Sequence, residues 1–205
     1  MPYLEHHPND FFPRHLLHDE LANPRLVFCR TFDEQINMPD ARKYLEKWLC
    51  ATFYDKPVLN RRFLLLLMGI HEDMLRLLEA AHLLRLEDPE RRKASCAEEQ
   101  VYGPGLPEPE LYCSSSNKHY TAWHYLPRYI SRKEFANPYR VFDKLCAWKT
   151  LPQWRDALQN FFSAAVSGSR IYECQNDENV YLTCRHLLRL VEAAHLVKVR
   201  EGNGL

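Results

Sequence analysis

The sequence predicts an all-α protein made from two copies of a three-helix unit. Residues 11–88 are echoed by residues 125–201, and in both copies apolar residues recur at helical spacing. Neither copy shows the sustained apolar–polar alternation of a half-buried strand. We therefore expect about six helices packed as one helical domain. The clearest repeated stretches are Glu20–Pro24 with Glu134–Pro138, and Leu75–Leu83 with Leu188–Leu196.

The repeat divides the chain into an N-terminal extension (residues 1–10), a first repeat (11–88), a linker or loop (89–124) and a second repeat (125–205). The linker is rich in Pro, Gly and Ser, which are typical of irregular structure. One repeat alone is marginal as a folding unit. The two repeats are expected to pack on each other, about a pseudo-twofold axis or as a side-by-side stack.

Each predicted helix has a start signal and an apolar stripe. An Asn or Thr that can cap the helix precedes a Pro in the first turn of the first two helices of each copy. The third helix is the longest and carries a line of apolar residues every three or four positions. The predicted starts are Asn23 and Asn137, then Asn37 and Thr150; the third helices span Asn60–Arg85 and Asn179–Arg200. The copies stay aligned only if Ile36 is an extra residue in the first.

Composition favours a soluble, cytoplasmic protein. Lys plus Arg and Asp plus Glu number 27 each, so no overall field draws the chain to nucleic acid or acidic lipid. No apolar run is long enough to span a membrane, and the first residues lack the pattern of a signal peptide. The seven cysteines are odd in number and do not repeat between the copies, which favours reduced thiols.

Seven polar positions are identical in the two copies. The Asn pair is explained as a helix cap. Arg14 and Glu20 are expected to pair with each other or with a neighbouring helix, and Arg76 with Glu79 one turn away. Arg42 lies off the apolar stripe and is expected to be solvated. The seven pairs are Arg14/Arg128, Glu20/Glu134, Asn23/Asn137, Arg42/Arg155, Arg76/Arg189, Glu79/Glu192 and His82/His195.

The repeated Glu-x-x-His suggests a metal hypothesis. Di-iron carboxylate bundles use a Glu and a His three residues apart on each of two helices, with a Glu from each of two others. Iron, manganese or zinc would then be the metal; otherwise no cofactor is expected. Helical periodicity places these side chains toward the edge of the apolar sector, which favours salt bridges instead. The candidate ligands are Glu79, His82, Glu192 and His195, with Glu20 and Glu134 completing the set.

Two further features are candidates for contacts with a partner. Leu64, Leu65 and Leu66 stand where the second copy has Asp177, Glu178 and Asn179, so either the linker covers them or they form a patch for another subunit or a ligand. Trp123 lies in an aromatic segment ahead of the second copy, which can stack on bases, line a pocket or dock on the core. Arg14 and Arg128 are the accompanying basic candidates.

No catalytic motif is present, so the sequence favours a non-catalytic helical binding or scaffold protein that engages a protein partner or itself. The first alternative is a metal-binding protein using the repeated Glu-x-x-His. The second is a nucleic-acid-binding helical module, because three-helix units include helix-turn-helix domains. Zero net charge disfavours that second alternative.

Overall fold

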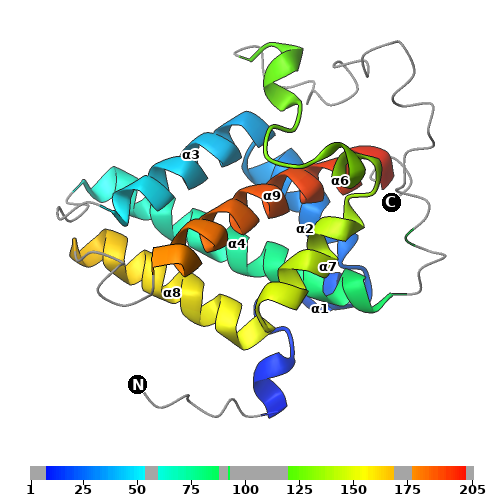
Figure 1. Cartoon of the computed structure of the whole chain (residues 1–205), viewed down its shortest axis with the longest axis horizontal. Coiled ribbons are helices and arrows are strands. Elements are labelled where there is room, and N and C mark those ends of the chain that lie inside the picture. The colour runs from blue at the N-terminus through cyan, green and yellow to red at the C-terminus, as the bar shows by residue number, and fades with distance from the viewer. Residues whose placement is uncertain (1–7, 54–59, 88–91, 93–119, 169–176, 202–205) are drawn as a thin grey trace.

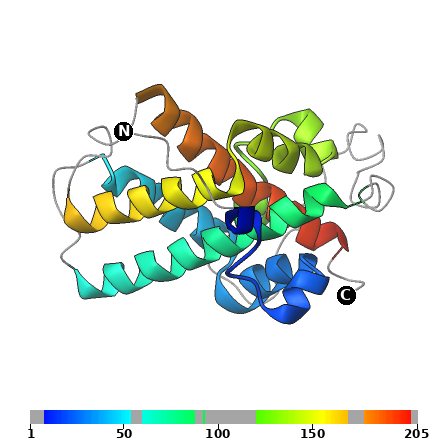
Figure 2. The same ribbon diagram turned by 90° about the horizontal axis from the view of Figure 1, so that it is seen from below.

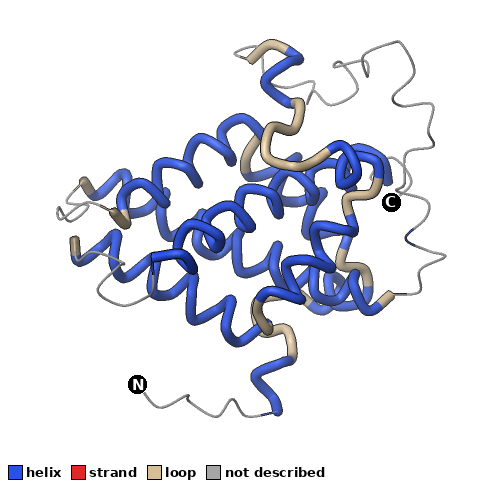
Figure 3. Tube along the Cα trace, viewed as in Figure 1, coloured by secondary structure: helices blue, strands red, loops and turns tan. Residues whose placement is uncertain are grey.

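The protein is described by a computed structural model at residues 8–53, 60–87, 92, 120–168 and 177–201. All regular structure in these ranges is helical, with eight α-helices and no strand (Figure 3). The first half of the chain contributes η1 (Pro8–Phe11), α1 (His18–Ala22), α2 (Arg25–Arg30), η2 (Thr31–Gln35), α3 (Met38–Ala51) and α4 (Arg61–Leu86). The second half contributes η6 (Ala122–Tyr125), α6 (Arg132–Ala136), α7 (Tyr139–Trp148), α8 (Leu151–Ser167) and α9 (Asp177–Glu201).

Capping side chains begin three of the long helices: Asn37 and Thr150 were expected as caps, and Asn60 was expected only as the start of its helix. The Asn37 side chain accepts from the backbone N–H of Asp40 at 2.9 Å, and Asn60 accepts from Arg62 at the same distance. The Thr150 hydroxyl accepts from the third residue of α8. These bonds satisfy backbone donors that the first turn of a helix leaves unpaired.

The prediction of six helices missed a short helix in each half. The helices α1 and α6 precede the Asn-Pro starts, and they are too short to show an apolar period. Glu20 and Glu134, expected ahead of any helix, are the third residues of these helices. Their carboxylates accept from the backbone N–H of Leu17 and of Ser131, at 2.9 and 2.8 Å. Each Glu therefore closes the first turn of its own helix.

The helices α4 and α9 cross each other near the middle of the molecule, as Figures 1 and 2 both show. Helices of the two halves interleave there: α8 and α7 pack on α4, while α3 and α2 pack on α9. As a result residues 74–81 of α4 and residues 190–197 of α9 are buried without interruption. A helix segment covered on every side has no solvent face, so polar residues within it need partners inside the protein.

Ile36 explains a local irregularity of the first half that the described part of the second half lacks. The residues Thr31–Gln35 form a π-helical turn, in which the N–H of Ile36 donates to the carbonyl of Thr31, five residues back, at 2.9 Å. At the corresponding point after α7, Lys149 donates to Leu145, four residues back. A π turn is the usual way for a helix to absorb one additional residue.

Among the described helices, none combines the length and apolar character that crossing a membrane requires. Cys29, Cys50, Cys146 and Cys184 carry free thiols. The remaining cysteines lie outside the described residues, as do residues 89–91 and 93–119 of the linker, which was expected to cover Leu64–Leu66.

Candidate functional site

Glu79 lies at the centre of a buried polar cluster. Its carboxylate accepts from the backbone N–H groups of Arg14 and His15, at 2.9 and 2.8 Å, and contacts His15 Nδ1 at 2.8 Å. Arg155, from α8 in the other half, donates its Nε at 3.0 Å. Burial opposes the charge, but the hydrogen bonds from His15 and Arg155 outweigh it and lower the pKa of Glu79.

Glu192 occupies the equivalent position on α9 and has the same kinds of partner. It accepts from the backbone N–H groups of Arg128, Tyr129 and Ile130 at 2.7, 2.7 and 3.2 Å. Arg42, from α3 in the first half, lies 2.8 Å from its Oε1. Deep burial raises the pKa of Glu192, against the opposing effect of these donors and of Arg42.

The two arginines also bind the chain that leads into the opposite half. Arg42 donates to the carbonyls of His124 and Leu126, at 3.2 and 3.0 Å. Arg155 donates to the carbonyls of Asp10 and Phe12, the latter at 2.6 Å. One planar guanidinium thus joins a buried carboxylate to two backbone carbonyls, a geometry that suits Arg better than Lys.

This arrangement corrects two expectations. Arg42, expected in solvent, is buried, and Glu79, expected at the edge of the apolar sector, is fully buried. Both expectations assumed one solvent-facing side for each helix, whereas α4 is covered all round at Glu79 and α3 faces α9 at Arg42. The sequence signal that could have indicated this buried pairing was the presence of the same residues in both copies, Arg42 with Arg155 and Glu79 with Glu192.

A second pair of buried carboxylates fixes α1 and α6. Glu20 accepts from Arg76 of α4 and from Arg30, the latter at 2.9 Å. Glu134 accepts from Arg189 of α9 and from Lys144. The expected one-turn pairing of Arg76 with Glu79 is therefore replaced by a longer-range contact. Despite burial, these cations and the Ser131 donors hold the pKa of Glu134 at about 2.

The predicted metal ligands are divided between separate environments. Burial lowers the pKa of His195 to about 3, and its ring meets Phe32 edge-on with centroids 5.2 Å apart. His82 is half-buried on α4. The carboxylates of Glu79 and Glu192 are already held by N–H donors and arginine. Within the described residues, no three His, Cys, Asp or Glu side chains are grouped so as to hold a metal ion.

The exposed side of α4 presents a different surface. Leu65 and Met68 are 61% and 52% exposed, whereas Leu64 and Leu66 are half-buried. Arg61 and Glu72 continue the same line of exposed positions at its two ends. We call these four residues, Arg61, Leu65, Met68 and Glu72, the α4 seam. Of the four seam residues, only Leu65 was among the candidates for partner contacts that the sequence suggested. The spacing of four, three and four residues places all four on one face of the helix and was visible in the sequence.

A groove runs beside the seam, between α4 and the π turn. It has a volume of about 370 Å³, and its floor and walls include Ile36, Leu66, Gly69 and Ile70. Asp73 also lines it, and burial raises the pKa of the Asp73 carboxyl group to about 6. The extra residue of the first copy therefore forms part of this groove, which we call the α4–η2 groove.

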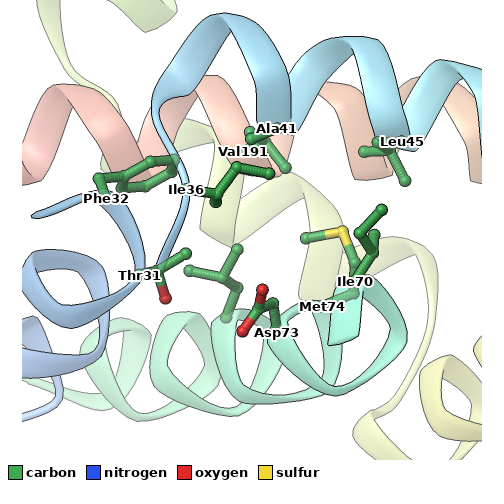
Figure 4. A pocket seen from close by; sticks show the side chains of 10 residues that line it. Thr31, Phe32, Ile36, Ala41, Leu45, Ile70, Asp73, Met74 and Val191 are labelled. Atoms are coloured by element: carbon green, nitrogen blue, oxygen red, sulfur yellow. The ribbon is translucent and has the colours of Figure 1, made fainter. Parts of the chain in front are cut away.

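A much smaller cavity of about 20 Å³ lies next to the groove, lined by Thr31, Ile36, Asp73 and Met74 among others (Figure 4). Its volume suits a single water molecule. The hydroxyl of Thr31 is buried here without a hydrogen-bond partner. The cavity is too small for an organic ligand.

The remaining candidates lie away from α4. Trp123, on η6, is 55% exposed. Arg14 and Arg128 extend their side chains at the surface, and it is their backbone N–H groups that bind Glu79 and Glu192. Lys43, Tyr120, His124 and Arg128 line a hollow of about 170 Å³ beside η6.

Comparison of the chain with models of known protein families, with curated proteins and with solved structures finds no match in any of the three.

Proposed function

We propose that this protein is a non-catalytic helical scaffold that binds a protein partner through the α4 seam and the α4–η2 groove. The observation that carries the proposal is the exposure of Leu65 and Met68 one turn apart on a helix whose residues 74–81 are buried without interruption. Neighbouring exposed apolar side chains with a polar surround are typical of protein interaction surfaces.

We further infer that the helical scaffold arose by duplication of one three-helix unit and has approximate twofold symmetry. Equivalent residues support this inference, because Arg42 with Glu192 and Arg155 with Glu79 make the same contact in opposite directions. The pairs Arg76–Glu20 and Arg189–Glu134 repeat in the same way within each half. In this view the repeated polar residues hold the helices together, and the binding surface lies where the two copies differ.

The π turn supports the choice of surface. Among the described residues it occurs in the first half only and brings Ile36 into the α4–η2 groove, while α7 has no such turn. Such turns are found frequently at functional sites because they keep an irregular backbone that packing alone would not require.

Protein is favoured over the other classes of partner. The seam carries one basic and one acidic end, whereas a surface for nucleic acid needs a run of positive charge. Metal binding has no comparable support in the described residues, because hydrogen bonds from N–H groups and arginine already hold Glu79 and Glu192.

Site-specific photocrosslinking tests the proposal. A benzophenone amino acid replaces Leu65 in one variant and Gln159, which is exposed on α8, in a matched control. The expected result in cells is a discrete protein adduct from position 65 that the control does not give, and mass spectrometry identifies it. Equal labelling from both positions, or none from position 65, would contradict the proposal.

A further inference from the structure

The α4 seam is self-complementary when two copies run antiparallel. Its residues follow the spacing i, i+4, i+7 and i+11, so they fall within about 60° of one another around the helix. The two central residues are Leu65 and Met68, and the ends are the cation Arg61 and the anion Glu72. This is the spacing of a short helix-pairing seam with charged ends.

We propose that the α4 seam pairs with the α4 seam of a second copy of this chain, with the two helices antiparallel. A twofold axis between Leu65 and Met68 places Leu65 against the partner's Met68 and Arg61 against the partner's Glu72. The charged ends are about 16 Å apart along each helix, so both ion pairs form together. A parallel arrangement would bring Arg61 against the partner's Arg61 and is disfavoured.

The structure around the α4 seam is compatible with a second copy of the chain as its partner. Within the described residues neither Arg61 nor Glu72 forms an ion pair, so both charges are available to a partner. Gly69 is exposed beside the seam, and a Cβ built on it would meet no atom within 4 Å. The absence of a side chain there allows a second helix to approach closely.

The size of the seam sets the strength of the pairing. Stable interfaces bury about 1,200–2,000 Å², more than four side chains on each partner supply. The α4–η2 groove adds apolar surface next to the seam, through Ile36 and Leu66. We therefore expect a reversible dimer with a dissociation constant on the order of 10 µM.

This inference rests on the proposed function, because it takes the seam as the binding surface and specifies its occupant. The test is the mass of the full chain, 24.4 kDa as a monomer, by sedimentation over a micromolar concentration series. The expected result is a rise toward twice that mass. Arg61→Glu and Glu72→Arg, each alone, place like charges together at both ends and should keep the chain monomeric.

An equimolar mixture of the two variants gives the decisive result. Every Arg61→Glu end then faces a Glu72→Arg end, so the mixture is expected to form the dimer that neither variant forms alone. Arg140→Glu, a charge reversal at an exposed position on α7, is the matched control and should dimerise like the unchanged chain. Circular dichroism checks that all variants are equally helical.

Three results would overturn the inference: an unchanged chain that is monomeric throughout, variants that dimerise like it, or a mixture that does not associate. Failure of this inference and failure of the proposed function are distinguishable. A monomeric chain whose position 65 crosslinks to a different protein overturns self-pairing and leaves the proposed function in place. A monomeric chain with no adduct at that position, as expected if the linker covers the seam, overturns both.

Discussion

The guanidinium of Arg42 lies 2.8 Å from the carboxylate of Glu192, although the two residues belong to different halves of the chain. Both side chains are buried, and the guanidinium also donates to the carbonyls of His124 and Leu126. The contact therefore fixes α3, α9 and the segment before the second half in one arrangement. Arg155 does the same around Glu79.

Removal of Arg42 should strongly destabilise the protein. Arg42→Met leaves Glu192 buried without its counter-charge, which should lower the free energy of unfolding by about 3–5 kcal/mol. Arg42→Lys should be intermediate, because an ammonium cannot span the carboxylate and both carbonyls. Urea denaturation measures each change. Arg140→Met, at an exposed site, should stay within about 0.5 kcal/mol of the unchanged chain; a comparable value for Arg42→Met would refute the role assigned to Arg42.

Glu79 should control the order of the segment before α1. Its carboxylate is the acceptor for the backbone N–H groups of Arg14 and His15, so Glu79→Gln should speed hydrogen exchange at those two amides. Amides of Arg128 and Tyr129, which bond to Glu192, serve as the internal control and should exchange as before. Exchange measured residue by residue by NMR checks this, and unchanged protection at His15 would count against it.

His195 should make the protein less stable in mild acid. Its folded pKa of about 3 lies below the ordinary value of 6.5, so the unfolded chain binds a proton that the native state excludes. Below pH 6.5 the free energy of unfolding should therefore fall, by at most about 1.4 kcal/mol per pH unit from this group. Asp73, with its raised pKa, acts in the opposite direction over part of this range.

The measurement is thus the difference in slope between the unchanged chain and His195→Gln from pH 6.5 to pH 5. The variant should show the smaller loss of stability on acidification. Gln159→Ala, at an exposed position on α8 that carries no titratable group, should leave the slope unchanged. Identical slopes for His195→Gln and the unchanged chain would show that this histidine is not buried as a neutral group.

Deletion of Ile36 should be tolerated better than deletion of Lys149. Without Ile36 the π turn can revert to an ordinary helix end like that of α7, at a cost of about 1–3 kcal/mol for the lost apolar burial. Deletion of Lys149 instead removes the connection that lets Thr150 cap α8, and no surplus residue is present to absorb the change. Thermal unfolding of the two deletion variants compares them directly.

The positions of the long helices followed closely from local chemistry, whereas the short helices α1 and α6 and the partners of the polar residues did not. The caps Asn37, Asn60 and Thr150 act on residues three positions away or fewer, so their effect can be read along the chain. Burial of Arg42 depends on α9, which is distant in the sequence. Helical periodicity assumes one buried face, and that assumption fails where α4 and α9 are covered on all sides.

Arg42 and Arg155 each bind a glutamate of the other half, which limits how either half can fold when it is separated. Each half brings a buried anion whose guanidinium is supplied by the other, so neither folds alone without an uncompensated charge in its interior. If the chain arose by the proposed duplication, the same bonds would earlier have joined two separate copies of the unit, and the ancestral unit would have been an obligate dimer. When the chain is cut between the repeats, each fragment should accordingly be unfolded alone. The two fragments should assemble into the folded protein when they are mixed.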